Sequence, residues 1–458
     1  MFRKQAYRIH FVGIGGIGMS GIAELLLNLG YCVSGSDIRT TETTQRLAKL
    51  GGTIFTGHAE AHIDGAHVVV VSSAVKEDNP EVIAARRHSV PVIPRAEMLA
   101  ELMRLKYSIA VAGTHGKTST SSIIAGILAA GNLDPTIVIG GKLESLGSNA
   151  FLGKGDFLVA EADESDGSFL NMSPTISVVT NIDLDHVDFY ADMDEIKAAF
   201  TQFIDSVPFY GLSILCLDCE SVQDVIPYLS KRFTTYGIAS QADFQAKNIS
   251  FDGLTSQFTV LQNQTLLGDI HLNLPGLHNI YNSLAAVAVS MELGIDFKIV
   301  QDALRMMKGV QRRLEIKGEA KGITVVDDYA HHPTEVKATL SAIKEAWPDR
   351  KLRVAFQPHR FSRTEMLFDD FSRAFYQTDE LFILPIYAAG EAPIEGVSSE
   401  HLAMEIAAKG HKNVAHAATF DEVAEQVKKR ATAGDVFLTM GAGDVWKLGE
   451  QILSAVRS

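Results

Sequence analysis

Cysteine is scarce in this sequence, with only Cys32, Cys216 and Cys219 among 458 residues. So few and unevenly spaced thiols exclude a disulfide-stapled scaffold and fit a reducing compartment. Cys216 and Cys219 have the C-x-x-C spacing of half a zinc site, but no second Cys or His pair stands near them in the sequence. We therefore expect the segment ILCLDC to be a buried strand that ends in a turn.

Positive charge and long apolar runs are also lacking. Lys and Arg number 41 against 55 Asp and Glu, for a net charge of -14. Such a chain has no overall field that draws it to nucleic acid or to anionic lipid, so we expect neither as a partner. No apolar run reaches the roughly 18 residues of a membrane span, and the amino terminus meets glycines before a signal-peptide core develops. We expect a cytoplasmic protein that holds any phosphate locally.

What is present is a globular composition arranged in repeating α/β units. At roughly 150 residues per domain, the length corresponds to about three domains. Short apolar strand candidates alternate with helical stretches, which predicts mostly parallel sheets; in the first unit they lie at 9–14, 31–34, 67–72 and 90–93. The pattern restarts at Tyr107 and after Val310. The predicted fold class is α/β with three domains: Rossmann-like at 1–106, P-loop ATPase-like at 107–310, and Rossmann-like again at 311–458.

The first glycine cluster follows an apolar strand and precedes an apolar helix. It contains G-x-G-x-x-G as Gly13, Gly15 and Gly18. Glycines allow a tight turn and let backbone N–H groups approach a pyrophosphate at a helix N-terminus. Asp37 follows about where an acidic ribose partner would lie. Alone, this motif favours an NAD-dependent oxidoreductase, with a ligand-free turn as the alternative.

A second glycine loop, GTHGKT, lies between another apolar strand and an apolar helix. This order of strand, loop and helix is typical of a nucleoside triphosphate site. Lys117 would supply a point charge to the β- and γ-phosphates, and the Thr118 hydroxyl would bind magnesium. The loop is a shortened variant of the Walker A pattern, because Val111 stands where the first glycine would be. A merely structural turn is the alternative.

Polar clusters follow several of the later strands. Carboxylates and imidazoles at strand ends of a parallel sheet can bind magnesium or orient a phosphoryl acceptor. The first two clusters are Glu161, Asp163, Glu164 and Asp166, and then Asp183, Asp185, His186 and Asp188. We expect only one or two members of each to contact a metal or substrate, with the others capping turns or solvated.

Two further groups suit nucleotide and anion recognition. Asn amides can read an adenine edge, although they can also cap a helix; His278, Asn279 and Asn282 begin an apolar helix. An arginine guanidinium binds two oxygens of a carboxylate or phosphate at once. The third domain offers Arg312, Arg313, Asp327, Asp328, Tyr329, His331, His332, His359, Arg360 and Arg363. The paired histidines fit equally well as satisfied core groups at a helix entry.

Nine motifs in order resemble those of the Mur ligases over nearly the whole chain: GIGGIGMSGIAELL, VSGSD, AGTHGKTST, EADESDGSF, TNIDLDHVDFY, GLHNIYNSLAA, GVQRRLE, DDYAHHP and QPHRFSRT. The resemblance implies a three-domain cytoplasmic enzyme that uses ATP and magnesium to join L-alanine to the carboxylate of UDP-N-acetylmuramate, in peptidoglycan precursor synthesis. It also explains two glycine loops, since the first would bind the UDP pyrophosphate and the second ATP. Competing hypotheses are the oxidoreductase and a module whose ATP hydrolysis drives a conformational change. Oligomeric state stays open.

The resemblance also implies roles for individual residues. Contacts to ATP would come from Gly113, Thr114, His115, Gly116, Lys117, Thr118, Ser119, Asn279, Asn282 and Arg313. Magnesium ligands would be Thr118, Glu161 and His186, and the catalytic groups Lys117, Glu161 and His186. The nucleotide sugar would meet Gly15, Gly16, Ile17, Gly18, Met19, Ser20 and Asp37. The amino-acid pocket would be walled by Tyr329, His331, His359 and Arg363. We expect Arg363 to pair with the alanine carboxylate from a loop, with a surface arginine as the alternative.

Overall fold

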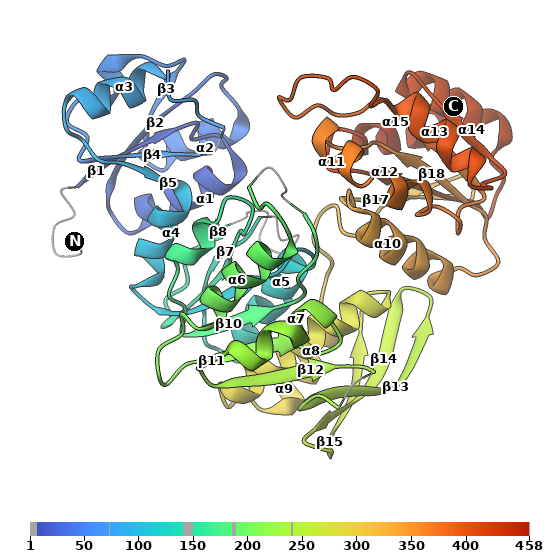
Figure 1. Ribbon diagram of the computed structural model, residues 1–458, viewed down its shortest axis with the longest axis horizontal. Coiled ribbons are helices and arrows are strands. Elements are labelled where there is room, and N and C mark those ends of the chain that lie inside the picture. Colours follow the sequence, from blue (N-terminus) through green and yellow to red (C-terminus); the bar gives the residue numbers. More distant parts are fainter. Residues whose placement is uncertain (1–6, 73, 141–149, 186–188, 240, 458) are drawn as a thin grey trace. The chain divides into compact units, whose positions relative to one another are not determined.

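The structure is a computed structural model that describes residues 7–72, 74–140, 150–185, 189–239 and 241–457 (Figure 1). Three sheets follow one another along the chain, each combined with helices. Within the described ranges, no helix is both long and apolar enough to cross a bilayer. The predicted α/β fold class is confirmed, with one sheet in each of the three predicted domains.

The first sheet is entirely parallel, with strand order β3-β2-β1-β4-β5. Its strands are β1 (Arg8–Val12), β2 (Cys32–Asp37), β3 (Thr53–Thr56), β4 (Val68–Val71) and β5 (Val92–Pro94). Its helices are α1 (Ile17–Asn28), α2 (Glu42–Lys49), η1 (Glu60–Ile63), α3 (Pro80–Arg87) and α4 (Arg95–Met103). The sequence did not predict β3, because this four-residue edge strand has no fully buried side chain to mark it.

The second sheet has ten strands in the order β15-β14-β13-β12-β11-β10-β6-β9-β7-β8. They are β6 (Tyr107–Ala112), β7 (Thr136–Val138), β8 (Ala150–Phe151), β9 (Phe157–Glu161), β10 (Ile176–Val179), β11 (Leu212–Cys216), β12 (Phe233–Gly237), β13 (Phe244–Asp252), β14 (Thr255–Gln262) and β15 (Thr265–Leu272). The helices are α5 (Lys117–Ala130), η2 (Ser168–Asn171), α6 (Met193–Ile204), α7 (Glu220–Val225), η3 (Ile226–Tyr228), α8 (Leu277–Glu292) and α9 (Phe297–Arg305).

Strand β6 lies between β10 and β9 and is parallel to both. The segments that follow these three strands therefore leave the sheet at one edge, where the second glycine loop and both acidic clusters begin. Strand β11 ends at the buried Cys216, which confirms the prediction of a buried strand followed by a turn. Strands β13 to β15 extend the sheet on its other side and were not predicted.

The third sheet has the order β16-β17-β21-β18-β19-β20 and is parallel apart from the antiparallel pair β16 and β17. Its strands are β16 (Glu315–Ala320), β17 (Ile323–Asp328), β18 (Leu352–Phe356), β19 (Glu380–Ile383), β20 (Val414–His416) and β21 (Val436–Met440). Its helices are α10 (Pro333–Ala346), α11 (Phe361–Met366), α12 (Phe368–Ser372), α13 (Ser399–Ala408), α14 (Phe420–Arg430) and α15 (Trp446–Arg457). Two apolar clusters bury its two faces.

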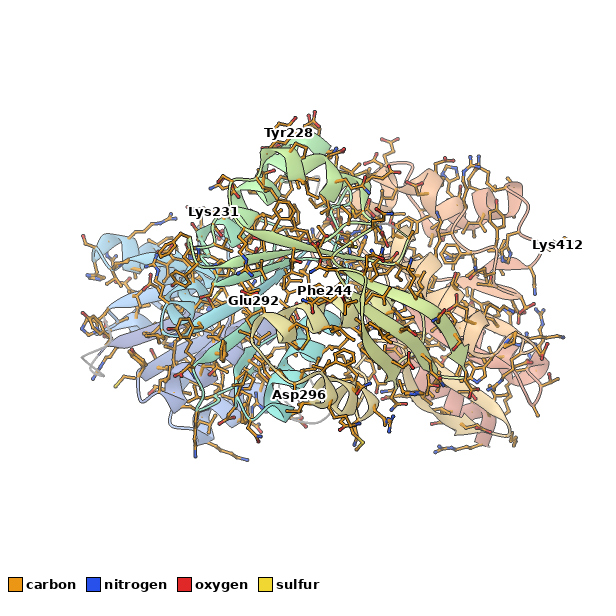
Figure 2. All side chains as sticks on the ribbon, turned by 90° about the horizontal axis from the view of Figure 1, so that it is seen from below. Tyr228, Lys231, Phe244, Glu292, Asp296 and Lys412 are labelled. Atoms are coloured by element: carbon orange, nitrogen blue, oxygen red, sulfur yellow. The ribbon has the colours of Figure 1, made fainter. Side chains whose placement is uncertain are left out.

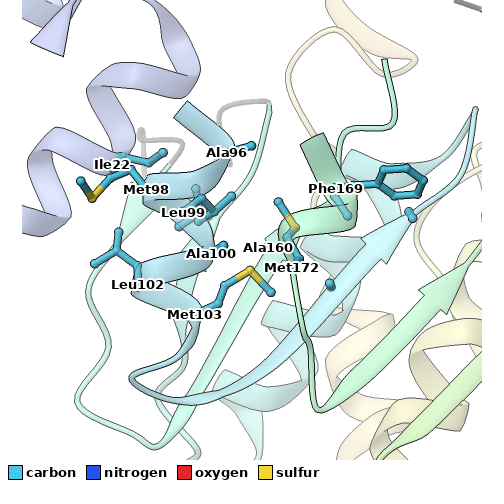
Figure 3. Close-up of a cluster of buried hydrophobic side chains, with 14 of the residues drawn as sticks. Ile22, Ala96, Met98, Leu99, Ala100, Leu102, Met103, Ala160, Phe169 and Met172 are labelled. Carbon is cyan, nitrogen blue, oxygen red and sulfur yellow. The ribbon is translucent and has the colours of Figure 1, made fainter. Parts of the chain in front are cut away.

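Spatially, the chain forms two compact units. The first contains residues 1–246, 260–267 and 281–304, and the second contains 247–259, 268–280 and 305–458. In the first unit, one apolar core runs from the first sheet through α4 into the second sheet. Figure 3 shows Met98 of α4 beside Ile22 of α1, with Phe169, Met172 and Ala160 of the second sheet's layer belonging to the same cluster. Helix α4 thus connects the two sheets through buried side chains.

Candidate active site

The second glycine loop, residues 113–118, is held by the end of β10. Thr180 Oγ1 and Asn181 Nδ2 both donate to the carbonyl of His115, at 2.5 and 3.0 Å. In return, the His115 N–H donates to Asn181 Oδ1 at 2.8 Å. Gly113 has a φ of +131°, and a Cβ there would strike the Thr180 hydroxyl. The loop is therefore a rigid turn whose conformation requires glycine.

Lys117 begins α5, and its ammonium lies in an acidic pocket. Nζ donates to the Gly113 carbonyl at 2.6 Å and to both carboxylate oxygens of Glu164 at 2.8 Å. Burial alone would lower the pKa of Lys117, but the carboxylates of Glu164, Asp163 and Glu161 outweigh it and hold the pKa above its usual value. Lys117 is therefore a fixed positive charge at the start of the helix.

Oxygen donors surround the same helix start. Thr118, in the first turn of α5, is buried, and Ser119 follows it. Glu161 ends β9 beside Val111 of β6, and its Oε1 accepts from the Gly140 N–H at 2.8 Å. This set of hydroxyl and carboxylate oxygens matches what Mg²⁺ prefers. His186 lies outside the described residues.

Helix α8 reaches this loop through Asn282. Its Oδ1 accepts from Thr120 Oγ1 at 3.0 Å, and a Cβ on Gly116 would lie 2.8 Å from the same oxygen. Asn279, one turn earlier, donates its side-chain amide to the Pro275 carbonyl at 2.8 Å. Asn282 is thus beside the glycine loop, as a nucleotide contact requires, while the bond from the Asn279 amide to Pro275 lies within its own segment.

The first glycine loop is fixed by the end of β2. The Gly13 and Ile14 amides donate to the Ser36 carbonyl at 2.8 and 3.0 Å, and the Gly15 amide donates to Asp37 Oδ2 at 2.9 Å. Asp37 therefore holds the loop itself, and Gly15 has no room for a side chain because a Cβ would lie 2.8 Å from that carboxylate.

The start of α1 follows this loop, with Gly16 as an N-cap that has no side-chain hydrogen bond. The side chains of Met19 and Ser20 are buried, and the Ser20 N–H donates to the Gly16 carbonyl at 2.8 Å. The side chain of Ile17 lies outside the described part of the chain. Helix α1 thus offers backbone groups rather than charged side chains at its N-terminus.

One arginine connects the two loops within the first unit. Arg95, the first residue of α4, lies against Gly18, where a Cβ would be 3.0 Å from its Cδ. Its Nη2 donates to Asp163 Oδ2 at 3.5 Å, and Asp163 is among the carboxylates that raise the pKa of Lys117. A single side chain therefore spans from the first glycine loop to the acidic pocket of the second.

The four residues predicted to wall an amino-acid pocket gather in the third domain. The Tyr329 and His331 rings lie 5.4 Å apart, and the His331 and His359 rings 5.8 Å apart. Nη1 of Arg363 lies 3.2 Å from His359 Nδ1. One expectation is corrected: Arg363 lies in the short helix α11 rather than in a loop. Its side chain is buried, which counts against the alternative of a surface arginine. The turn that Arg360 makes after β18, with a φ of +69°, leads directly into this helix.

Neighbouring charges in this domain are also arranged around Tyr329. The guanidinium carbons of Arg312 and Arg313 lie 5.0 and 5.2 Å from its ring centre. Burial raises the pKa of Asp328 to about 6, although Arg313 and two backbone amides oppose the rise. Burial, and then the charge of Arg313, lower the pKa of His278 to about 4. Arg312 is tied to Asp327 at 2.9 Å.

A polar cavity of about 270 Å³ lies elsewhere in the first unit, at the amino ends of β11 and β12. Its lining includes Arg232, Phe244 and Glu292, of which the last two are labelled in Figure 2. Arg232 and Glu292 close part of it through two hydrogen bonds of 2.7 and 2.8 Å. No predicted site residue lines this cavity, and it lies away from the strand ends that carry the glycine loop.

Comparison with known proteins identifies the family. Three family models match in order: the Mur ligase family catalytic domain at residues 8–107, the Mur ligase middle domain at 111–290, and the Mur ligase glutamate ligase domain at 312–443. The chain belongs to the Mur ligase family.

Relatives of this Mur ligase match it over almost their whole length. A protein of Desulfatibacillum aliphaticivorans named UDP-N-acetylmuramate--L-alanine ligase is 62% identical, over 99% of this chain and 100% of its own. Its namesake in Desulfosudis oleivorans is 60% identical over 98% of each chain. The crystal structure of UDP-N-acetylmuramate-alanine ligase from Thermotoga maritima superposes with a TM-score of 0.83 at 30% identity, covering 98% of both chains.

Three groups in this Mur ligase site were not assigned from sequence. Glu164 pairs with Lys117, Thr180 and Asn181 clamp the loop, and Arg95 joins the two loops. Glu164 was one of four acidic candidates, and the dipeptide Thr180-Asn181 at the end of an apolar strand was the signal for the clamp. Arg95 stands in no glycine or acidic motif, so no local pattern marked it.

Proposed function

We propose that this Mur ligase joins L-alanine to the lactyl carboxylate of UDP-N-acetylmuramate, using ATP, in peptidoglycan precursor synthesis in the cytoplasm. The shared name of relatives at 62 and 60% identity supports this pair of substrates. The observation that carries the proposal is the partly buried Lys117 ammonium, set among carboxylates directly after a glycine turn and at the start of α5. Such a charge suits a transferring phosphoryl group.

The proposed reaction has two steps, because a carboxylate acylates an amine only after activation. The sugar carboxylate attacks the γ-phosphorus of ATP in line, ADP leaves, and an acyl phosphate forms. The amine of alanine then attacks the acyl carbon, inorganic phosphate leaves, and the amine nitrogen loses its proton. Lys117 stabilises the negative charge on the phosphoryl oxygens in the first step. Its role is to position the reactants and neutralise charge, and it forms no covalent bond.

Glu164 pairs with the Lys117 ammonium before nucleotide binds. A γ-phosphate that binds the ammonium must replace part of the pairing with Glu164, whose two oxygens each lie 2.8 Å from Nζ. The lysine is therefore already extended along the loop before nucleotide arrives. This arrangement lowers the conformational entropy that phosphate binding has to overcome.

The oxygen donors nearby suit a magnesium ion. Thr118 and Glu161 would hold it, with His186 as a further ligand or orienting group. Bound magnesium would neutralise charge on the nucleotide phosphates. The all-oxygen character of the described donors, a hydroxyl and a carboxylate, supports this choice over a softer metal.

The remaining predicted contacts divide between the substrates. The first glycine loop, residues 13–20 with Asp37, would receive the UDP pyrophosphate, and Gly113 to Ser119 with Asn279, Asn282 and Arg313 would receive ATP. Tyr329, His331, His359 and Arg363 would form the amino-acid pocket. The contacts among their rings and the Arg363 guanidinium, all within one domain, support a shared pocket. The guanidinium of Arg363 suits the carboxylate of an amino acid, because it can bind both oxygens at once.

The decisive experiment measures phosphate release from ATP with UDP-N-acetylmuramate, screened across single amino acids. We expect release with L-alanine far above that with other amino acids, and a ligated product by mass spectrometry. ATPase activity indifferent to amino acids would favour a nucleotide-driven module. Enhanced fluorescence of NADH on tight binding would favour an oxidoreductase.

A further inference from the structure

One face of the first sheet buries a carboxylate that the proposed chemistry does not use. Glu81, from α3, is 0% exposed, and its polar partners lie outside both glycine loops. Five groups surround its two oxygens: Ser36 Oγ at 2.6 Å, His62 Nδ1 at 2.7 Å, His58 Nδ1 at 3.3 Å, the Ala59 N–H at 3.3 Å and His10 Nε2 at 3.5 Å. These groups come from four different segments of the domain and converge on one side chain.

The carboxylate is ionised in this setting. Burial alone would raise the pKa of Glu81, but the His10 imidazole 3.5 Å away and the hydrogen bonds with Ser36 and His62 outweigh it and lower the pKa to about 2. A buried charge is costly unless it is fully paired, so an apolar side chain would be the simpler filling for this face. The apolar part of the same face is a cluster of only five buried residues: Val12, Ile63, Val69, Ala84 and Ala85.

Ser36 links this carboxylate to the first glycine loop. Its hydroxyl donates to Glu81, while its carbonyl accepts from the Gly13 and Ile14 amides at 2.8 and 3.0 Å. The next residue, Asp37, accepts from the Gly15 amide at 2.9 Å. The end of β2 therefore sets three consecutive amides of the loop, and Glu81 accepts a hydrogen bond from a side chain at that same strand end.

We propose that Glu81 is a positioning residue for nucleotide-sugar binding, acting through Ser36 on the loop formed by residues 13–18. The inference rests on the proposed function, because it takes this loop as the UDP pyrophosphate site. A pyrophosphate bound by backbone N–H groups is sensitive to their directions. The short hydrogen bond to the buried Glu81 carboxylate fixes the Ser36 side chain. It thereby also fixes the Ser36 carbonyl, to which the loop amides donate.

The test compares two substrates in one enzyme. Glu81→Gln keeps the shape of the side chain but removes its charge. We expect the KM for UDP-N-acetylmuramate to rise about tenfold, as for loss of a charge-assisted hydrogen bond, with kcat and the KM for ATP within about twofold. Calorimetry with UDP alone should show the same loss. An unchanged KM for the sugar, or equal losses for sugar and ATP, would overturn the inference.

Ser36→Ala and Ser34→Ala provide the second variant and its matched control. Both remove a hydroxyl from β2, but Ser34 bonds His10, at 2.9 Å, and neither Glu81 nor the loop. Ser36→Ala should raise the same KM, and Glu81→Gln should add little in that background because the two share one route. Ser34→Ala, which reaches Glu81 only through His10, should raise it much less than Ser36→Ala does. Additive effects of the first two would contradict action through Ser36.

The proposed function and this inference fail in different ways. If wild-type enzyme releases no phosphate with any amino acid and UDP-N-acetylmuramate, the proposed function is wrong and the inference falls with it. If the wild type is active and Glu81→Gln and Ser36→Ala both keep its KM for the sugar, only the inference is wrong. Should Glu81→Gln fail to fold, Ser36→Ala with its control decides the matter.

Discussion

The two glycine loops use opposite means to prepare a helix N-terminus for phosphate. The first is suspended from the end of β2 through backbone amides, and no charged side chain stands in the opening turn of α1. The second is clamped at its carbonyl of His115, which leaves Lys117 in the opening turn of α5 among carboxylates. The first arrangement suits holding a pyrophosphate that does not react, and the second suits a phosphoryl group in transfer.

The largest effect should come from removing the charge of the second loop. Lys117→Ala should lower ligation about a thousandfold, because phosphoryl transfer loses its fixed cation. Calorimetry should still find nearly unchanged affinity for UDP-N-acetylmuramate. Lys197→Ala, which removes a lysine paired with Asp224 at 2.7 Å on the surface, is the control and should stay active. Near wild-type turnover of Lys117→Ala would remove the triphosphate site from this loop.

Low pH should weaken the hydrogen bonds of Glu81 that support the first glycine loop. The folded-state pKa of Glu81 is lowered to about 2, so its contribution is complete above pH 4.5 and is lost as pH falls toward 2. We expect roughly 3 kcal/mol of unfolding free energy to disappear across that window. Denaturant titrations of wild type and Glu81→Gln measure this, since the variant should have a flatter profile there. Parallel profiles would show that Glu81 does not titrate in this way.

A side chain in the first glycine loop should weaken binding of the nucleotide sugar without weakening binding of ATP. Gly15→Val places a side chain where the Cβ alone would lie 2.8 Å from Asp37 Oδ2 and 3.1 Å from Thr44 Cγ2. The affinity for the nucleotide sugar should fall about fiftyfold, because the loop must shift away from Asp37. ATP affinity should hold, as measured by calorimetry. Equal loss of both ligands would indicate misfolding instead.

A variant outside both loops tests whether amino-acid recognition is separate from them. Arg363→Lys should raise the KM for L-alanine about twentyfold, because an ammonium cannot reproduce the guanidinium fork. The KM for UDP-N-acetylmuramate should change much less. Hydroxylamine should still trap the acyl phosphate formed from the sugar substrate and ATP. An unchanged alanine KM would place that pocket elsewhere.

The smallest effect should be a change in the magnesium dependence of turnover, with no effect at the first glycine loop. Glu161→Ala should lower turnover about tenfold at low magnesium and recover in part as magnesium or manganese is raised. Binding of the nucleotide sugar, measured by calorimetry, should not depend on the metal in either form. A wild-type metal titration for this variant would give Glu161 a structural role.

The features that could be predicted from the sequence are those formed by residues close together in the chain. Both glycine loops, Lys117 and the strand ends lie in local motifs, so their elements could be placed before the structure. Glu164 could not be distinguished from its three acidic neighbours, because spacing along the chain selects a strand end but not a side-chain direction. Strands β13 and β15 and the edge strand β3 have weak alternation and no motif, so only tertiary pairing identifies them. Strand β14 does alternate, with Ser256, Phe258 and Val260 buried, but the polar Ser256 weakens the pattern in the sequence.

The Glu81 group was beyond sequence reasoning for a related reason. His10, His58 and His62 stand on separate segments, and their convergence depends on the parallel order of β1, β2 and β3. By contrast, His331 and His359 belong to quoted motifs, and the prediction that they share a pocket with Tyr329 depended on the family resemblance. The structure brings those three rings into contact, while their role toward alanine stays a prediction.

The three thiols also form a graded set of chemical reporters. Cys32, at the start of β2, is exposed, whereas Cys219 is partly covered and bonded to the backbone of Ile182. Burial raises the pKa of Cys216 to about 12, so its thiolate is almost absent at neutral pH. A maleimide dye should therefore label Cys32 first, marking the segment that holds the first glycine loop. Delayed labelling of Cys216 would then record the opening of the second sheet in the same sample.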